Sequence, residues 1–162
     1  MTKLIVADAS PLIVLARASQ LRILPLVAGK VIVPDVVAHE CTHDQNLPGA
    51  RAISEAFAKG WLKPQPKTPL VEPIIAAGLD LGESMALALA VALKAPILID
   101  ERIGRQAAFA QSLRVVGSIG ILLLAKKRGL IERVAPAIQD LKREGLYISP
   151  ELEQEALRRA GE

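Results

Sequence analysis

Four acidic side chains lie close to the ends of predicted strands: Asp8 and Asp100 directly follow strands, Glu83 opens a predicted helix, and Glu40 lies in the predicted helix after the strand at 31–33. Asp8 follows the apolar run of residues 3–7, and Asp100 follows residues 97–99. In a parallel α/β sheet, strand ends and helix starts lie on the same edge, so the four carboxyl groups can converge there. Carboxylates a few ångströms apart repel one another unless divalent cations neutralise them. Oxygen ligands without His or Cys favour Mg²⁺ or Mn²⁺, so the pattern predicts a site for such a cation.

Each acid also has a simpler explanation when it is taken alone. Glu83 suits the first turn of a helix, because an acidic side chain there interacts favourably with the helix dipole. Asp100 can cap a helix, and Glu40 can face water on a helix surface. Asp8 is harder to explain in this way. Ser10 is predicted to cap the helix that follows, and a carboxylate at the end of a buried strand has few polar partners.

The elements that must position these acids alternate between strand and helix along the chain. Short apolar runs predict strands at residues 3–7, 31–33, 97–99 and 115–116, and an edge strand at 61–62. One helix is predicted to begin at Pro34, and helical periodicity predicts others at 10–18, 21–28, 50–59, 82–94, 103–112 and 119–128. Four prolines predict a loop over residues 63–73. The alternation favours an α/β fold of three layers with a mainly parallel central sheet.

The segment after Gly129 is expected to play a different role from the rest. It is predicted to form two helices on either side of residues 147–150, with Ser149 as a cap and Pro150 at the first helical position. Its acidic and basic side chains are interleaved, which is typical of a solvated helix surface. We therefore expect residues 1–129 to form the main part of the domain. Residues 130–162 are expected to extend it for regulation or oligomerisation, apart from the acidic site.

Length and composition limit the class of protein. The 162 residues, 51% of them apolar, suit one globular domain, and a single cysteine excludes an internal disulfide. Neither a signal peptide nor a membrane-spanning run is recognisable, so we expect a cytoplasmic protein that does not contact a membrane. The formal net charge of +3 favours approach to a polyanion. With only four aromatic residues, bound nucleic acid is expected to be held through its phosphates.

Several segments, taken in order, resemble the PIN-domain ribonucleases, and within them the VapC-like toxins of prokaryotic toxin-antitoxin pairs. The resemblance covers about residues 4–129. It rests on the segments at 6–12 (VADASPL), 33–40 (VPDVVAHE), 81–88 (LGESMALA), 98–102 (LIDER) and 116–122 (VGSIGIL). Each motif alone is weak, but the ordered set contains all the acidic positions of the family. It implies a PIN-like fold for residues 1–129.

The resemblance also implies a chemistry. Asp8, Glu40, Glu83 and Asp100 would be the catalytic acids and would hold Mg²⁺ or Mn²⁺, so that a metal-bound water attacks phosphorus and leaves a 5′-phosphate. The supporting hydroxyls would be those of Ser10 and Ser118. The family further implies a homodimer, RNA as substrate, and a small antitoxin protein as partner.

Two departures from the family pattern concern the acids. The third acid is often Asp in the wider family and is Glu83 here, and the pair Asp100 and Glu101 leaves the fourth metal ligand ambiguous by one residue. Arg102 and Arg105, one helical turn apart, could hold a substrate phosphate or could simply belong to a solvated helix face.

A competing motif lies at His39-Glu40-Cys41-Thr42-His43, which matches the H-E-x-x-H pattern of zinc peptidases. A third zinc ligand would have to be Glu55 or Glu72, and this interpretation leaves the other acids unexplained. A second alternative is a non-catalytic PIN-like module that binds RNA or protein. The chain lacks the Asp-x-Asp of haloacid-dehalogenase phosphotransferases and the Gly-rich first turn of dinucleotide-binding or P-loop sites.

The predicted helices at 10–18 and 21–28 carry apolar residues on more than one face. One contact with a sheet uses only one face of a helix. We therefore expect a second subunit or a partner helix to cover part of them.

Overall fold

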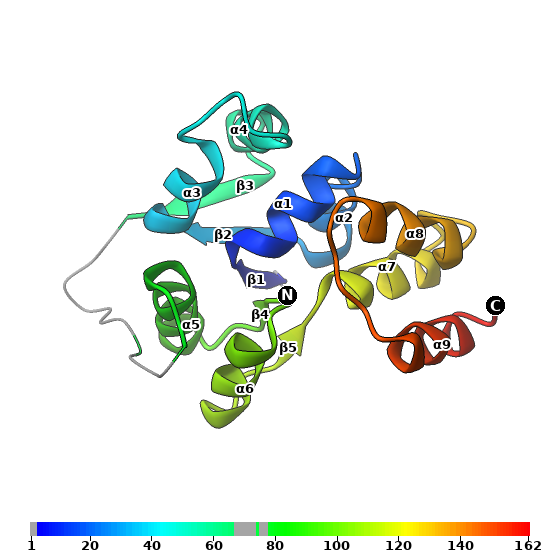
Figure 1. The fold of residues 1–162 in the computed structure, drawn as a ribbon. Helices are drawn as coiled ribbons and strands as arrows, with labels where there is room; N and C mark the ends of the chain where they lie inside the picture. The colour runs from blue at the N-terminus through cyan, green and yellow to red at the C-terminus, as the bar shows by residue number, and fades with distance from the viewer. Residues whose placement is uncertain (1–2, 67–73, 75–77) are drawn as a thin grey trace.

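The central sheet has five parallel strands in the order β3-β2-β1-β4-β5 (Figure 1). It belongs to a computed structural model that describes residues 3–66, 74 and 78–162. The strands are β1 (Leu4–Ala7), β2 (Lys30–Pro34), β3 (Leu62–Gln65), β4 (Ile97–Leu98) and β5 (Val115–Val116). Helices cover both faces, which confirms the predicted three-layer α/β fold with a parallel sheet.

Nine helices are present in the described residues. The first five are α1 (Ala9–Arg17), α2 (Ile23–Ala28), α3 (Asp35–Thr42), α4 (Ala50–Ala58) and α5 (Leu81–Leu93). The remaining four are α6 (Arg102–Ala110), α7 (Ser118–Lys127), α8 (Val134–Arg143) and α9 (Pro150–Arg159). None of the described helices is long and apolar enough to cross a membrane.

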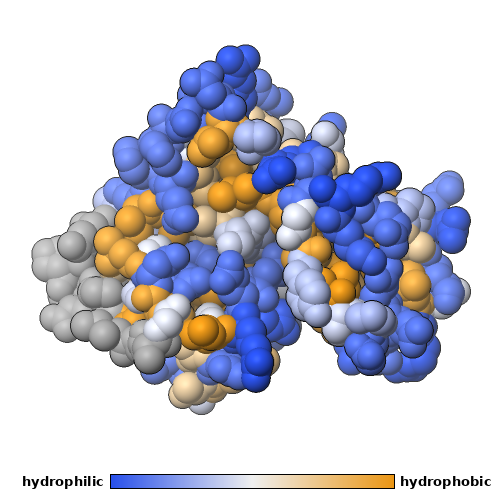
Figure 2. All heavy atoms as spheres, in the orientation of Figure 1, coloured by the Kyte–Doolittle hydropathy of each residue, from blue (hydrophilic) through white to orange (hydrophobic). Residues whose placement is uncertain are grey.

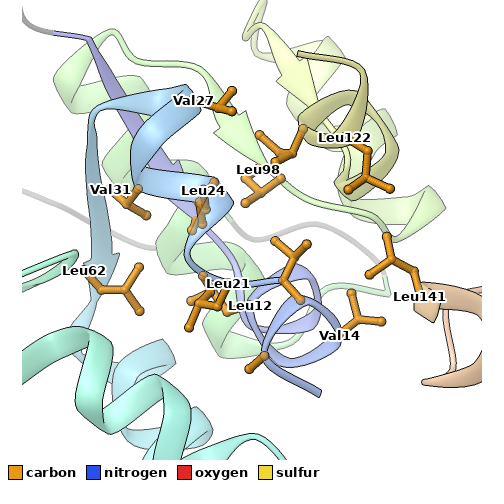
Figure 3. Close-up of a cluster of buried hydrophobic side chains, with 14 of the residues drawn as sticks. Leu12, Val14, Leu21, Leu24, Val27, Val31, Leu62, Leu98, Leu122 and Leu141 are labelled. Carbon is orange, nitrogen blue, oxygen red and sulfur yellow. The ribbon is translucent and has the colours of Figure 1, made fainter. Parts of the chain in front are cut away.

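Alternating side chains of the central strands form two apolar clusters, one on each face of the sheet. Ile5 and Ala7 face the larger cluster, which packs against α1, α2, α4, α7 and α8. Figure 3 shows part of this cluster, with Leu12 of α1 near Leu24 of α2 and Leu141 of α8 on its outer side. Val6 faces the smaller cluster, which packs against α5 and α6. The two clusters fix the strand ends between the helical layers.

Helix α1 begins earlier than predicted. Its first residue is Ala9, and Asp8 occupies the N-cap position without a side-chain capping bond. The expectation that Ser10 caps this helix is therefore wrong, because Ser10 lies inside the first turn. Its hydroxyl instead donates to Oε1 of Glu101 at 3.4 Å.

Apolar residues of α1 are covered within the chain itself. Leu12 and Leu15 are fully buried, and the helix packs against α3, α4 and α8. Helix α1 therefore offers little apolar surface to a second subunit or partner helix. On α2, Leu26 remains 53% exposed.

Strand β3 includes residues that were predicted to form a loop. Residues 62–65 pair with β2 through the register Val31↔Leu62 to Pro34↔Gln65, so Pro64 lies inside a strand. This is tolerated because β3 is at the edge of the sheet, where the missing amide of a proline leaves no partner unsatisfied. The predicted loop residues 67–73 lie outside the described residues.

The C-terminal helices follow the prediction closely. The hydroxyl of Ser149 accepts a hydrogen bond from the amide of Leu152 at 3.2 Å, and Pro150 is the first residue of α9. Helix α8 packs on α7 and α1, and α9 packs on α7 and α8 (Figure 1). These helices therefore extend the layer that α1 and α7 form.

Candidate functional site

Asp8 ends β1 at the carboxyl edge of the sheet. Its amide donates to the carbonyl of Leu98 in the neighbouring β4 at 3.0 Å, and the residue is only 3% exposed. Burial raises the pKa of the carboxyl group to about 7, although the amide of Ala9 opposes the rise. Repulsion from Glu83, Asp80 and Glu40 raises this pKa further. A buried carboxyl group is thus held in a field of negative charge.

Three acids approach Asp8 from α3 and α5: Glu40, Asp80 and Glu83. Gly82 lies where they meet, since a Cβ atom there would be 3.1 Å from Oε2 of Glu40 and 3.4 Å from Oδ1 of Asp80. Glycine at this position leaves room for the two carboxylates. Burial and then repulsion from Asp80 raise the pKa of Glu40, and burial also raises that of Glu83.

Asp80 and Glu83 form a capping box at the start of α5. Oδ1 of Asp80 accepts from the amide of Glu83 at 2.8 Å, and Oε2 of Glu83 accepts from the amide of Asp80 at 3.1 Å. The simple explanation of Glu83 as a helix-start acid therefore holds alongside its place in the acidic group. Sequence reasoning missed Asp80, although an Asp three residues before a Glu at the start of an apolar helix indicates a capping box.

Asp100 follows β4 and binds the first residue of α7. Its Oδ1 accepts from the amide of Ser118 at 2.7 Å, and its Oδ2 accepts from the Ser118 hydroxyl at 2.6 Å. Asp100 therefore caps α7, and not α6, whose N-cap is Glu101. Burial raises the pKa of Asp100, whereas the Ser118 bonds and the nearby Arg105 oppose the rise. Ser118 thus supports Asp100 directly.

Arg105 and Asp100 meet at Gly117. A Cβ atom on Gly117 would lie 2.8 Å from Nη1 of Arg105 and 3.1 Å from Oδ1 of Asp100. Arg102, the first residue of α6, is exposed, as is Glu101. Glu101 raises the pKa of both Glu83 and Asp100, so it adjoins the acids of α5 as well as its neighbour.

The predicted acids thus fall into two adjoining groups. Asp8, Glu40 and Glu83 interact electrostatically with one another and with Asp80, while Asp100 interacts with Ser118, Arg105 and Glu101. None of the six acids forms a salt bridge with a described residue. Arg105 lies beside Asp100 and His43 lies near Glu40, but neither forms a salt bridge with these acids.

The histidines of the zinc-peptidase motif lie on the outer side of α3. His39 and His43 are exposed, and their rings stack with centroids 5.2 Å apart. Nδ1 of His43 is 3.1 Å from the carbonyl oxygen of His39. Glu55 is exposed on α4, and Glu72 lies outside the described residues. No described side chain completes a three-residue zinc site with these histidines.

Two surface hollows include Asp100. One, of about 460 Å³, is lined by Ser10, Glu101, Arg102 and residues 144–147, and the other, of about 940 Å³, lies between α7 and α9. Figure 2 shows the surface indented between the α6 side and the α9 side of the molecule. The α8–α9 connection lines the hollow that contains Asp100 and Glu101, so part of residues 130–162 lies beside the acidic group. That these residues supply no catalytic side chain stays a prediction.

A family model described as a PIN domain (DUF3368) matches residues 4–162. The chain belongs to this PIN-domain family. Among solved structures it is similar to a PilT N-terminus domain protein from Sulfolobus solfataricus P2, with 15% identity, a TM-score of 0.54, and coverage of 73% of this chain and 89% of that one. A domain of a functionally unknown protein from Methanocaldococcus jannaschii DSM 2661 has a TM-score of 0.49 at 15% identity, over 72% and 91% of the two chains. No curated protein matches the chain.

PIN domains are generally nucleases and typically use divalent metal ions. In this PIN domain the acidic group offers carboxylate oxygens that form no salt bridge with a described residue, and oxygens of this kind suit a hard divalent cation. No three of these side chains are already gathered about one point in the described part of the chain. The capping box holds Glu83, and Ser118 holds Asp100.

Proposed function

We propose that this PIN domain is a Mg²⁺- or Mn²⁺-dependent endoribonuclease. Asp8, Glu40, Glu83 and Asp100 would hold the cation, and Asp80 adjoins them as a further donor. The observation that carries the proposal is the buried Asp8 carboxyl group among other acids, none of which forms a salt bridge with a described residue. Such an arrangement is unfavourable without a cation, because unpaired buried charge is costly.

The residues around the acids have separable tasks. A bound cation would supply an activated water and neutralise charge that develops on the phosphate. Ser118 fixes both oxygens of Asp100, and Ser10 donates to Glu101. Arg105 stands beside Asp100, where its guanidinium can bind a substrate phosphate, and Arg102 can do the same from the start of α6. Whether Asp100 or Glu101 supplies the fourth ligand depends on which carboxylate turns toward the cation.

The proposal extends to a biological role. The resemblance to VapC-like proteins supports a cytoplasmic toxin that is neutralised by a small antitoxin protein and acts as a homodimer. Helices α5 and α6 carry exposed apolar side chains that a second copy could cover. These side chains are Leu81, Val91, Leu93, Ile103 and Phe109.

Cleavage of a labelled single-stranded RNA in the presence of different metals tests the activity. We expect cleavage with Mg²⁺ or Mn²⁺, products with 5′-phosphates, and no cleavage in EDTA. Zinc should not replace these ions, and replacing His39 and His43 by Ala should leave the rate unchanged.

The outcomes separate the alternatives. RNA binding without cleavage under any metal would favour the non-catalytic module. Zinc-dependent peptide hydrolysis that is lost with His39→Ala would favour the peptidase.

Light scattering at micromolar concentration tests the homodimer. We expect a mass twice that of the 17.3 kDa chain, because burying the exposed apolar side chains of α5 and α6 favours association. Replacing Ile103 and Phe109 by Ser should shift the mass toward the monomer, whereas Leu26→Ser on α2 should not. A wild-type protein that remains at 17.3 kDa would contradict the dimer.

A further inference from the structure

Tyr147 is the most exposed of the large hydrophobic side chains in the described residues. It lies in the connection between α8 and α9 and is 88% exposed. It is the one tyrosine of the chain. Tyrosine normally buries much of its ring against the protein. The exposed ring at the edge of a candidate active site is therefore free to contact a ligand.

The backbone on both sides of Tyr147 is anchored. The amide of Leu146 donates to the carbonyl of Leu141 at 3.0 Å, Ile148 is buried, and Ser149 caps α9. The ring thus projects from a segment fixed at both ends. An anchored backbone lowers the entropic cost of placing the ring against a flat partner.

Tyr147 lines both hollows that include Asp100. Charged side chains line the same hollows: the smaller one has Arg102 with Asp100, Glu101 and Glu144, and the larger one has four basic side chains, Arg105 and Lys127 among them, with Asp100 and Glu155. The larger hollow is therefore the more favourable of the two for a phosphate. Arg102, Arg105 and Lys127 form no salt bridge with a described residue. The surroundings therefore combine an exposed ring with positive charges that are available to bind an anion.

We propose that Tyr147 forms a base-stacking subsite for single-stranded RNA beside the acidic group. A nucleotide offers both features that these side chains can bind, a flat base for the ring and phosphates for the arginines and Lys127. The strand must be single, because a base paired in a duplex cannot present its face to the ring. The inference rests on the proposed function, because Tyr147 would bind a base of the same RNA that the acidic group is proposed to cleave. It assigns a positioning role to Tyr147.

The test measures binding of a fluorescent oligoribonucleotide without added metal, in an Asp8→Asn background that keeps the RNA intact. Tyr147→Ala should weaken binding about tenfold, in line with the loss of one base–aromatic contact. Tyr147→Phe should bind like the parent, because the ring and not the hydroxyl group stacks. Leu26→Ala, which shortens an exposed side chain outside both hollows, is the matched control.

An abasic oligonucleotide separates stacking from other effects. It keeps the phosphates and lacks the bases, so its affinity should be equal for the parent and for Tyr147→Ala. Unchanged RNA binding in Tyr147→Ala would overturn the proposal, as would equal losses for RNA and the abasic strand. The result is independent of catalysis: if the wild-type protein cleaved no RNA with Mg²⁺ or Mn²⁺, Tyr147-dependent RNA binding would still support the subsite, and only the nuclease would be refuted.

Discussion

Replacing Asp8 by Asn should reduce cation-dependent RNA cleavage about a thousandfold, which corresponds to about 4 kcal/mol of lost transition-state stabilisation. Asn keeps the shape of the side chain but removes its charge, so the cation loses its most deeply placed ligand. Asp8 makes no capping bond to α1, and its charge is destabilising where it stands. The variant should therefore fold at least as well as the parent.

Single-turnover cleavage of labelled RNA with saturating enzyme measures this effect. Glu132→Gln is the matched control, since Glu132 is an exposed acid outside the acidic group and its loss should leave the rate unchanged. Thermal unfolding of both variants checks that the fold persists. A rate for Asp8→Asn within a few-fold of the parent would show that Asp8 is not a ligand.

The metal-free protein should lose stability as the pH rises from about 5 to about 8. Burial raises the pKa of Asp8 to about 7 in the folded protein, whereas the unfolded chain releases the same proton at the ordinary value for Asp. Between these two values the folded state binds more protons, so raising the pH favours unfolding. The free energy of unfolding should fall by about 3 kcal/mol across this range. The raised pKa values of Glu40, Glu83 and Asp100 act in the same direction.

Urea unfolding in EDTA at several pH values measures the slope. Asp8→Asn should flatten the dependence, and Glu132→Gln should leave it as in the parent. Mn²⁺ added at the high-pH end should restore stability to the parent and much less to Asp8→Asn, because a ligand that binds the folded state stabilises it. An equally steep dependence in Asp8→Asn would show that another group causes it.

Local patterns predicted the strands and most helix limits because the signals there are short-range. The apolar run before Asp8 and the Ser149-Pro150 start of α9 depend on neighbouring residues only. The start of α1 was misjudged because Ser10-Pro11 matches a cap signal. In the structure the helix begins at Ala9, and Ser10 bonds to Glu101, 91 residues away.

The sequence predicts which edge of the sheet carries the acids. It does not predict which residues from other elements lie beside them. The carboxyl ends of parallel strands lie on one edge of the sheet, and this rule alone predicts that Asp8 and Asp100 lie there together. Asp80 was not predicted as a member of the acidic group. Its carboxylate lies near the other acids because of the direction in which the chain enters α5. The position of Tyr147 near Asp100 depends on how α8 and α9 pack on α7, and residue spacing along the chain does not encode that packing.

Because the capping box of Asp80 and Glu83 stabilises α5, the acids of this site differ in how evolution would preserve them. Selection for folding alone would preserve Glu83, because it stabilises the start of α5, and would preserve Asp100, because it holds Ser118. A descendant that had given up catalysis would therefore keep both. Asp8 makes no side-chain capping bond to α1, and burial disfavours its charged form, so without a cation drift would replace it first. An aspartate at position 8 is thus a better marker of a working descendant than either of the other two acids.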